Sequence, residues 1–188
     1  MKTVCFNSKQ RAVEFRARQT RNRPPCLRVK PARASATLLE AEDGSWYVKI
    51  VNANERKVLA KLRGKRNVAQ VLKFSRSARS TIPPRTRGLR AGSSYAFLKS
   101  AGKTLDKWVA RSRRTPFWTQ QRVTRFRRDM TRAFRTLARA GYEHNDIYAR
   151  NVAYDGTKFT LIDFGKVRNV QPDSVPYSLN LAMKRIVK

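Results

Sequence analysis

The amino-acid sequence predicts an α+β fold in which a β-rich first half is followed by a helical second half. Two β-like runs, residues 36–41 and 45–51, flank an Asp43-Gly44 pair, which is a strong signal for a hairpin turn. Residues 119–140 instead have apolar side chains at helical spacing. Hydrophobic residues make up 40% of the 188 residues, so the chain has enough apolar material to bury a core.

The rest of the first half continues this pattern of short elements. Residues 54–62 have helical periodicity, and the runs 68–74 and 95–98 are typical of strands. The segment 75–94 is rich in Ser, Arg, Pro and Gly, so we expect a loop there.

The second half is dominated by the long helix predicted at residues 119–140. Its apolar residues form one narrow stripe: Val123, Phe126, Met130, Phe134 and Leu137. Its arginines gather on the opposite face: Arg122, Arg125, Arg128, Arg132, Arg135 and Arg139. One side of the helix should therefore pack into a core while the other is a positive surface, and Gly141 should end the helix.

Shorter elements surround the long helix. A short helix is expected at residues 104–110, and two β-like runs, 152–154 and 159–162, flank a turn at Asp155 and Gly156. The apolar stripe of the long helix needs a cover, and four apolar residues in or beside this hairpin are the nearest candidates: Ile147, Val152, Leu161 and Ile162.

The chain is strongly basic, because 43 Lys and Arg residues against 12 Asp and Glu residues give a formal net charge of +31. Self-repulsion at this level destabilises a compact monomer unless a polyanion or an acidic partner screens it. Nucleic acid is therefore the first candidate partner, and the six arginines of the long helix are the candidate contacts. The alternative is a solvated basic face with no specific partner.

Residues 1–26 are expected to form a basic N-terminal arm. The first 33 residues contain ten basic residues, one acid and three prolines. No stretch of the chain approaches the roughly 18 consecutive apolar residues of a membrane span, and the beginning lacks the apolar run of a signal peptide. The sequence therefore predicts an intracellular protein with no membrane partner.

Two polar motifs in the second half carry chemistry. Residues 143–151 read EHNDIYARN, and twelve residues after Asn151 comes the triplet Asp163, Phe164, Gly165. Together they resemble the HxDxxxxN catalytic loop and the DFG metal-binding triplet of the protein-kinase superfamily. The resemblance implies that a hairpin of this length returns Asp163 beside Asn151, where both can hold magnesium on nucleotide phosphates.

Residues in the first half resemble the same family in order. Lys49, in the strand 46–50, resembles the lysine that grips the phosphates, and Glu55 opens a helix similar to the one whose glutamate pairs with that lysine. Residues 95–102 occupy the place of the hinge strand, with Leu98 as the candidate contact for the nucleotide. Taken singly, Lys49 would be a solvated strand lysine and Glu55 an acid favoured by the helix dipole.

The resemblance implies a reaction and a role for each residue. Asp146 would accept the proton of the substrate hydroxyl, and Asn151 and Asp163 would bind Mg²⁺. Lys49, oriented by Glu55, would neutralise phosphate charge. The expected activity is that of a minimal protein kinase that transfers the γ-phosphoryl group of ATP to a serine or threonine hydroxyl of a protein.

The resemblance also implies a protein-kinase-like bilobal fold, with a small β-rich N-lobe at residues 27–99 and a truncated, helical C-lobe at residues 100–188. The chain departs from the family pattern at three places. Residues 31–38 have alanine where the glycine-rich phosphate loop is expected, Asn145 replaces the arginine of the catalytic loop, and Tyr148 stands where serine/threonine kinases have lysine.

The short segment that follows Gly165 contains no APE motif and no run that matches the later helices of an ordinary kinase. A reduced chain of this kind is similar to the kinase-like proteins of large DNA viruses, so the host cytoplasm, the nucleus and the virion are the expected locations. Residues 170–188 are expected either to close the base of the small lobe or to dock on another subunit. His144 is expected to be structural rather than a general base.

The alternative function is that of a catalytically weak protein of the same fold with a structural or nucleic-acid-binding role. The missing glycines and the absent peptide platform favour it. The complete set of catalytic and metal-binding carboxylates favours the enzyme.

Overall fold

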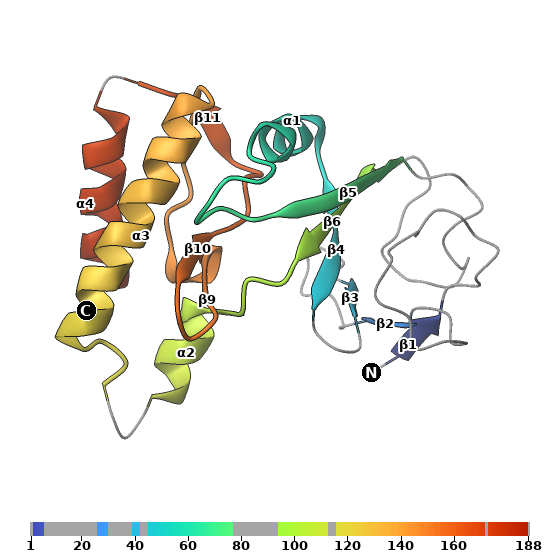
Figure 1. Cartoon of the computed structure of the whole chain (residues 1–188), viewed down its shortest axis with the longest axis horizontal. Coiled ribbons are helices and arrows are strands. Elements are labelled where there is room, and N and C mark those ends of the chain that lie inside the picture. The colour runs from blue at the N-terminus through green and yellow to red at the C-terminus, as the bar shows by residue number, and fades with distance from the viewer. Residues whose placement is uncertain are drawn as a thin grey trace. The chain divides into compact units, whose positions relative to one another are not determined.

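The computed structural model describes residues 2–5, 26–29, 39–41, 45–76, 94–112, 116–171 and 173–187 (Figure 1). The chain has mixed α/β structure, and its named strands pair antiparallel in three sheets. It divides into two compact units: the described parts of residues 1–53 and 71–100 belong to the first, and those of residues 54–70 and 101–188 belong to the second.

The first unit contains one six-stranded sheet with the order β1-β2-β3-β4-β6-β5. Its strands are β1 (Lys2–Cys5), β2 (Cys26–Val29), β3 (Leu39–Ala41), β4 (Trp46–Val51), β5 (Val71–Arg76) and β6 (Ser94–Lys99). The predicted strands are present at β3 to β6. The strands β1 and β2 were not expected, because each has only four residues, too few to show a clear period, and both lie in a segment rich in basic residues.

Three sequence predictions for the first unit lie outside the described residues. They are the turn at Asp43 and Gly44, the segment 31–38 that was compared with a glycine-rich loop, and most of the predicted loop at 75–94.

The second unit combines helices with short strands. Its helices are α1 (Ala53–Lys61, most of which lies in this unit), α2 (Leu105–Arg111), α3 (Gln120–Arg139), α4 (Ser174–Ile186) and the 3₁₀ turn η2 (Ala149–Asn151). Its strands are β7 (Lys103–Thr104), β8 (Tyr142–His144), β9 (Val152–Tyr154), β10 (Phe159–Leu161) and β11 (Val167–Asn169). Among the helices of the described ranges, none combines the length and the apolar character that a membrane crossing needs.

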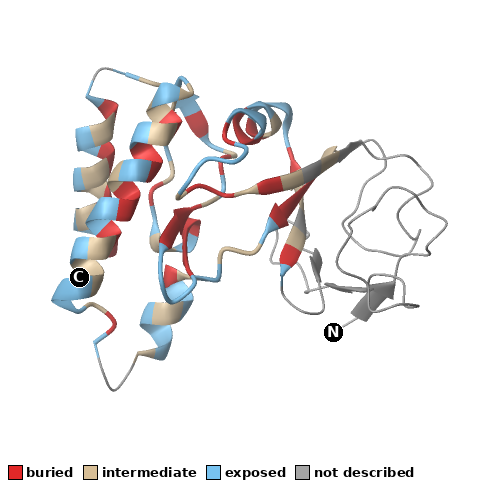
Figure 2. Cartoon of the chain, in the orientation of Figure 1, coloured by how far each residue is buried: buried red, intermediate tan, exposed pale blue. Residues whose placement is uncertain are grey.

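The helix α3 forms where the sequence predicted it. The Thr119 side chain caps its first turn by accepting a hydrogen bond from the Arg122 backbone, and Gly141 follows its end with a φ of 90°. Figure 2 shows the buried residues along one side of the helix. The predicted stripe is confirmed at four positions: Phe126, Met130, Phe134 and Leu137. Val123 is only half-buried, because it lies in the first turn.

The cover of this stripe is the predicted hairpin. The helix α3 packs against β10 and β8, and three of the expected covering residues are buried: Ile147, Val152 and Leu161. Ile162 is half-buried, because β10 ends at Leu161 and the chain turns there toward Asp163. The core of the second unit therefore lies between α3 and the segment that carries the kinase-like motifs.

The last helix, α4, packs on α3 and β8 of the same chain. Its buried side repeats every four residues: Ser174, Ser178, Ala182 and Ile186. Small side chains on this stripe let the two helices approach closely. Of the two expectations for residues 170–188, the structure shows closure of the second unit within the chain.

Candidate active site

The segment between β8 and η2 is fixed by the imidazole of His144. The Asp146 backbone N–H donates to Nδ1 of His144 at 3.2 Å, so the ring proton sits on Nε2, which donates to the Ile162 carbonyl oxygen at 3.1 Å. The ring also meets Phe164 edge-on, with 5.6 Å between centroids. Burial lowers the pKa of His144, although the hydrogen bond to Ile162 and the charge of Asp163 oppose this. A buried, neutral ring with both nitrogens engaged is structural, as expected.

The predicted metal ligands are brought together by the β9–β10 hairpin. Its register pairs Val152 with Leu161, and just beyond that pair the Ile162 N–H donates to the Asn151 carbonyl oxygen at 2.9 Å. Asp163 follows directly and has a φ of 62°, a left-handed conformation that aspartate tolerates better than most residues. The hairpin therefore returns Asp163 to the side of Asn151, as the spacing of the motifs implied.

Asn151 also forms a hydrogen bond with Asp146. Its side-chain amide donates through Nδ2 to the Asp146 carbonyl oxygen at 2.7 Å, and the residue is 4% exposed. Because the amide nitrogen is used in this way, the amide oxygen is the atom left for a ligand. One chain of hydrogen bonds thus connects Asp146, Asn151 and the backbone that leads into Asp163.

The carboxylate of Asp146 lies between two cations. Arg150 donates to Oδ1 at 2.9 Å, and Nζ of Lys166 lies 3.7 Å from Oδ2. Burial raises the pKa of Asp146, but hydrogen bonds from Arg150 and Asn151 and the charges of Arg150 and Lys166 outweigh it, so the pKa is lowered. Asp146 is therefore held as an ionised carboxylate.

The donor set fits Mg²⁺ bound together with a nucleotide. Carboxylate and amide oxygens are hard ligands, and Mg²⁺ in phosphate-transfer sites takes one or two protein ligands, with phosphate and water completing its shell. Asn151 and Asp163 supply two such oxygens. Within the described ranges no group of three or more His, Cys, Asp or Glu residues could hold a metal without such help.

The site residues predicted in the first half of the sequence, Lys49, Glu55 and Leu98, are divided between the two units. Glu55 is buried in α1 beside the triplet: a side chain at Gly165 would begin 3.7 Å from its Oε2. Lys49 lies in β4 opposite Ala96 of β6, and Leu98 is buried in β6. Lys49 and Leu98 belong to the first unit and Glu55 to the second, so the Lys49–Glu55 ion pair and the nucleotide contact of Leu98 stay predictions.

Sequence reasoning missed a basic and aromatic cluster around the catalytic loop. The guanidinium groups of Arg150 and Arg185 lie 4.4 and 4.8 Å from the ring centroid of Tyr148. Arg150 belongs to the motif at residues 143–151, but the motif does not predict its contacts. Arg185 comes from α4, far along the chain, and no motif signals its contact. The position of Lys166, directly after the triplet, could have indicated from the sequence that it lies near the site.

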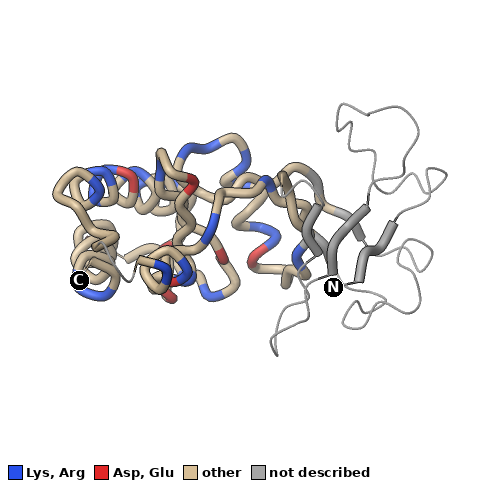
Figure 3. Tube along the Cα trace, turned by 90° about the horizontal axis from the view of Figure 1, so that it is seen from below, with Lys and Arg blue, Asp and Glu red and all other residues tan. Residues whose placement is uncertain are grey.

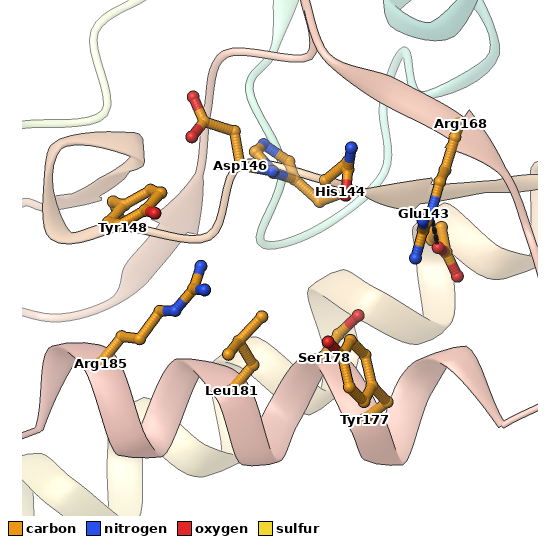
Figure 4. A pocket seen from close by; sticks show the side chains of 10 residues that line it. Glu143, His144, Asp146, Tyr148, Arg168, Tyr177, Ser178, Leu181 and Arg185 are labelled. Carbon is orange, nitrogen blue, oxygen red and sulfur yellow. Dashed lines mark hydrogen bonds and ion pairs between the residues drawn. The ribbon is translucent and has the colours of Figure 1, made fainter.

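A pocket of about 230 Å³ separates the catalytic loop from α4 (Figure 4). It is lined by Glu143, which pairs with Arg168, and by residues of α4 that include Ser178 and Arg185. Figure 4 shows the carboxylate of Asp146 directed away from α4. The carboxylate of Asp146 therefore faces the side opposite α4.

Comparison with known proteins gives a family match for this part of the chain. No curated protein matches the chain. The resemblance to reduced viral kinases and the predicted locations stay predictions. Residues 101–182, which contain the catalytic loop, the hairpin, the triplet and most of α4, match the model of the lipopolysaccharide kinase (Kdo/WaaP) family, a member of the protein-kinase-like superfamily, which supports a kinase-type phosphotransferase.

Proposed function

We propose that the protein is a Mg²⁺- and ATP-dependent phosphotransferase that transfers the γ-phosphoryl group of ATP to a hydroxyl group. The observation that carries this proposal is the hydrogen-bond chain from Asp146 through Asn151 to the backbone before Asp163. It supports the proposal because it holds Asp146, Asn151 and Asp163 close together, as one base and two oxygen ligands for a metal ion would require. Phosphoryl transfer depends mainly on such positioning and on electrostatic stabilisation.

Asp146 orients the acceptor hydroxyl and takes its proton. The hydroxyl oxygen forms a bond to the γ-phosphorus, the bond from that phosphorus to the β–γ bridging oxygen breaks, and ADP leaves with the electron pair. Bound between Asn151 and Asp163, Mg²⁺ would neutralise charge on the phosphate oxygens. Arg150 keeps Asp146 ionised and is itself held against Tyr148.

Lys166 supplies a cation that can move. Its side chain is 71% exposed, and its contact with Asp146, at 3.7 Å, is longer than that of Arg150. Because it follows the metal-binding triplet directly, it can turn from Asp146 to the transferring phosphoryl group and neutralise charge there. Lys49, oriented by Glu55, would bind the other phosphates, and the strand that contains Leu98 would contact adenine.

The acceptor we favour is a saccharide hydroxyl, because the family match covers Asp146 and the residues that bind its side chain or its carbonyl oxygen, Arg150, Asn151 and Lys166. The protein serine or threonine hydroxyl expected from the sequence is the second class of acceptor. Asp146 would take the proton of a hydroxyl group in both classes of acceptor. A direct comparison of acceptors is therefore needed to separate the two classes.

The test is transfer of labelled phosphate from ATP, with Mg²⁺, to lipopolysaccharide and its oligosaccharides in one set and to a panel of proteins in the other. The variant is Asp163→Asn, because asparagine also tolerates the left-handed backbone at this position. We expect it to lose about 100-fold or more in rate. The control is Asp106→Asn, at an exposed site in the first turn of α2, which should keep its rate within about twofold.

Equal labelling by the wild type and Asp163→Asn would contradict the proposal. Calorimetric titration with ATP, with and without Mg²⁺, separates the enzyme from the alternative of a catalytically weak protein. We expect nucleotide binding that depends on Mg²⁺ in the wild type and in Asp106→Asn, and a loss of that dependence in Asp163→Asn.

A further inference from the structure

Five arginines of α3 lie along its outer side, and we call them the arginine rail: Arg125, Arg128, Arg132, Arg135 and Arg139. At 3.6 residues per turn they fall within an arc of about 80°, opposite the buried stripe. Arg122 lies outside this arc and is engaged elsewhere. It donates to the Phe117 carbonyl oxygen at 2.7 Å and covers the Phe117 ring.

The charge of the rail is largely uncompensated. Figure 3 shows that Lys and Arg segments are more frequent than Asp and Glu segments along the described chain. Arg132, Arg135 and Arg139 are exposed and pair with no acid among the residues that the structure describes. Arg128 forms an ion pair with Oδ1 of the buried Asp129. The other carboxylate oxygen of Asp129, Oδ2, accepts a hydrogen bond from the Phe159 backbone N–H at 3.0 Å. Arg125 donates to a neutral group, the Thr157 carbonyl oxygen.

This arrangement is unfavourable for an isolated helix. Neighbouring members of the rail are three or four residues apart, and like charges at these spacings repel each other along a helix. The repulsion is relieved when a polyanion lies along the rail, because its phosphates then alternate with the guanidinium groups.

The rail fits a nucleic-acid backbone better than a membrane surface. A helix that lies on a membrane inserts an apolar face into the lipid. The apolar face of α3 is buried in the core, and exposed Gln121 and Thr124 add only polar groups to its outer side. The rail spans about 21 Å, over which one strand of B-DNA carries about six phosphates, close to the number of arginines.

We infer that the arginine rail is a binding surface for the phosphate backbone of nucleic acid, without sequence readout. Guanidinium groups on one exposed face contact phosphates, whereas base readout requires an element that enters a groove. This binding does not rest on the proposed phosphotransfer. The variant Asp163→Asn should therefore bind nucleic acid as the wild type does.

The test is fluorescence anisotropy with a labelled DNA duplex of about 20 base pairs, over a salt series from about 50 to 300 mM. The rail variant Arg132→Gln, Arg135→Gln, Arg139→Gln should flatten the slope of log K against log salt by about 2.7, which is 0.9 for each arginine. The control removes the same charge from exposed positions off the rail: Lys107→Gln, Arg111→Gln and Arg127→Gln. Its slope should change by less than about 1.

All six substitutions replace exposed side chains, so circular dichroism should show that both variants keep the wild-type fold. Equal slope changes in the two variants would overturn the inference, since binding would then follow net charge alone. Absence of binding by the wild type would also overturn it. So would a rail variant that loses binding to anionic vesicles but keeps its affinity for DNA. Two duplexes of unrelated sequence should bind within about twofold, and a strong preference for one would contradict backbone recognition.

Discussion

The helix α3 and the segment 142–169 that packs on it share an apolar core, but they differ in their polar contacts. The inner side of α3 is apolar, and Phe126, Met130 and Leu137 on it are fully buried. The segment 142–169 also buries apolar residues, such as Val152 and Leu161, but its site residues are positioned by polar contacts, such as those of His144 and Asn151 with the backbone. Apolar burial therefore provides most of the stability here, whereas a few buried hydrogen bonds set the geometry of the site.

The largest expected effect comes from removing a buried apolar side chain of α3. Phe134 is 3% exposed and belongs to the stripe of α3. Phe134→Ala should lower the free energy of unfolding by about 3 to 5 kcal/mol, because it removes a large buried side chain and leaves a cavity. Urea denaturation measures the loss, and phosphotransfer activity should fall with the folded fraction.

The matched control for this prediction is Val123→Ala in the same helix. Val123 is half-buried, so its truncation should cost about 1 kcal/mol or less. Equal losses in the two variants would show that the stripe does not provide the stability assigned to it.

The same difference explains how much of the fold could be predicted from the sequence. The stripe of α3 was visible because its apolar residues recur at helical spacing, and the hairpin was visible because two short apolar runs flank Asp155 and Gly156. The helix α4 was not predicted, because its buried side consists mainly of small residues, Ser174, Ser178 and Ala182, which give no apolar signal. The strands β7, β8 and β11 are too short to show a period.

In the candidate site, too, only part of the structure could be predicted from the sequence. Asp146, Asn151 and Asp163 were found because they belong to motifs with fixed spacing, and the structure joins them as expected. The contacts of Arg185 with Tyr148 and of Lys166 with Asp146 link residues far apart in the sequence. No periodicity marks such contacts, and the place of Lys166 directly after the triplet does not identify its partner, so only the folded chain reveals these contacts.

Asp129 joins the two regions and should show an intermediate effect. It is 2% exposed on the inner side of α3 and accepts a hydrogen bond from the Phe159 backbone N–H of the hairpin. Asp129→Leu should lower the free energy of unfolding by about 1 to 3 kcal/mol, because the buried Phe159 N–H loses its acceptor. Asp129→Asn keeps an acceptor oxygen and should lose less. Urea denaturation of the two variants checks this order, and an equal or larger loss in Asp129→Asn would contradict it.

The smallest effect is expected at the tip of the hairpin, where Asp155 fixes the turn. Its Oδ1 accepts hydrogen bonds from the backbone of Thr157 and Lys158, each at 2.9 Å, and from the Thr157 hydroxyl at 2.7 Å. Burial raises the pKa of Asp155, but these hydrogen bonds and the charge of Lys158 outweigh it, so the pKa lies below its ordinary value of 3.8. The folded state therefore favours the ionised carboxylate. The resulting stability is present above about pH 3.8 and is lost as the pH falls through the lower pKa of the folded state.

Asp155→Asn should be less stable than the wild type at pH 7, and the difference should shrink as the pH falls below 4. Thermal unfolding of both proteins between about pH 7 and pH 2 measures this, and a difference that stays constant across the range would show that the charge of Asp155 does not stabilise the turn.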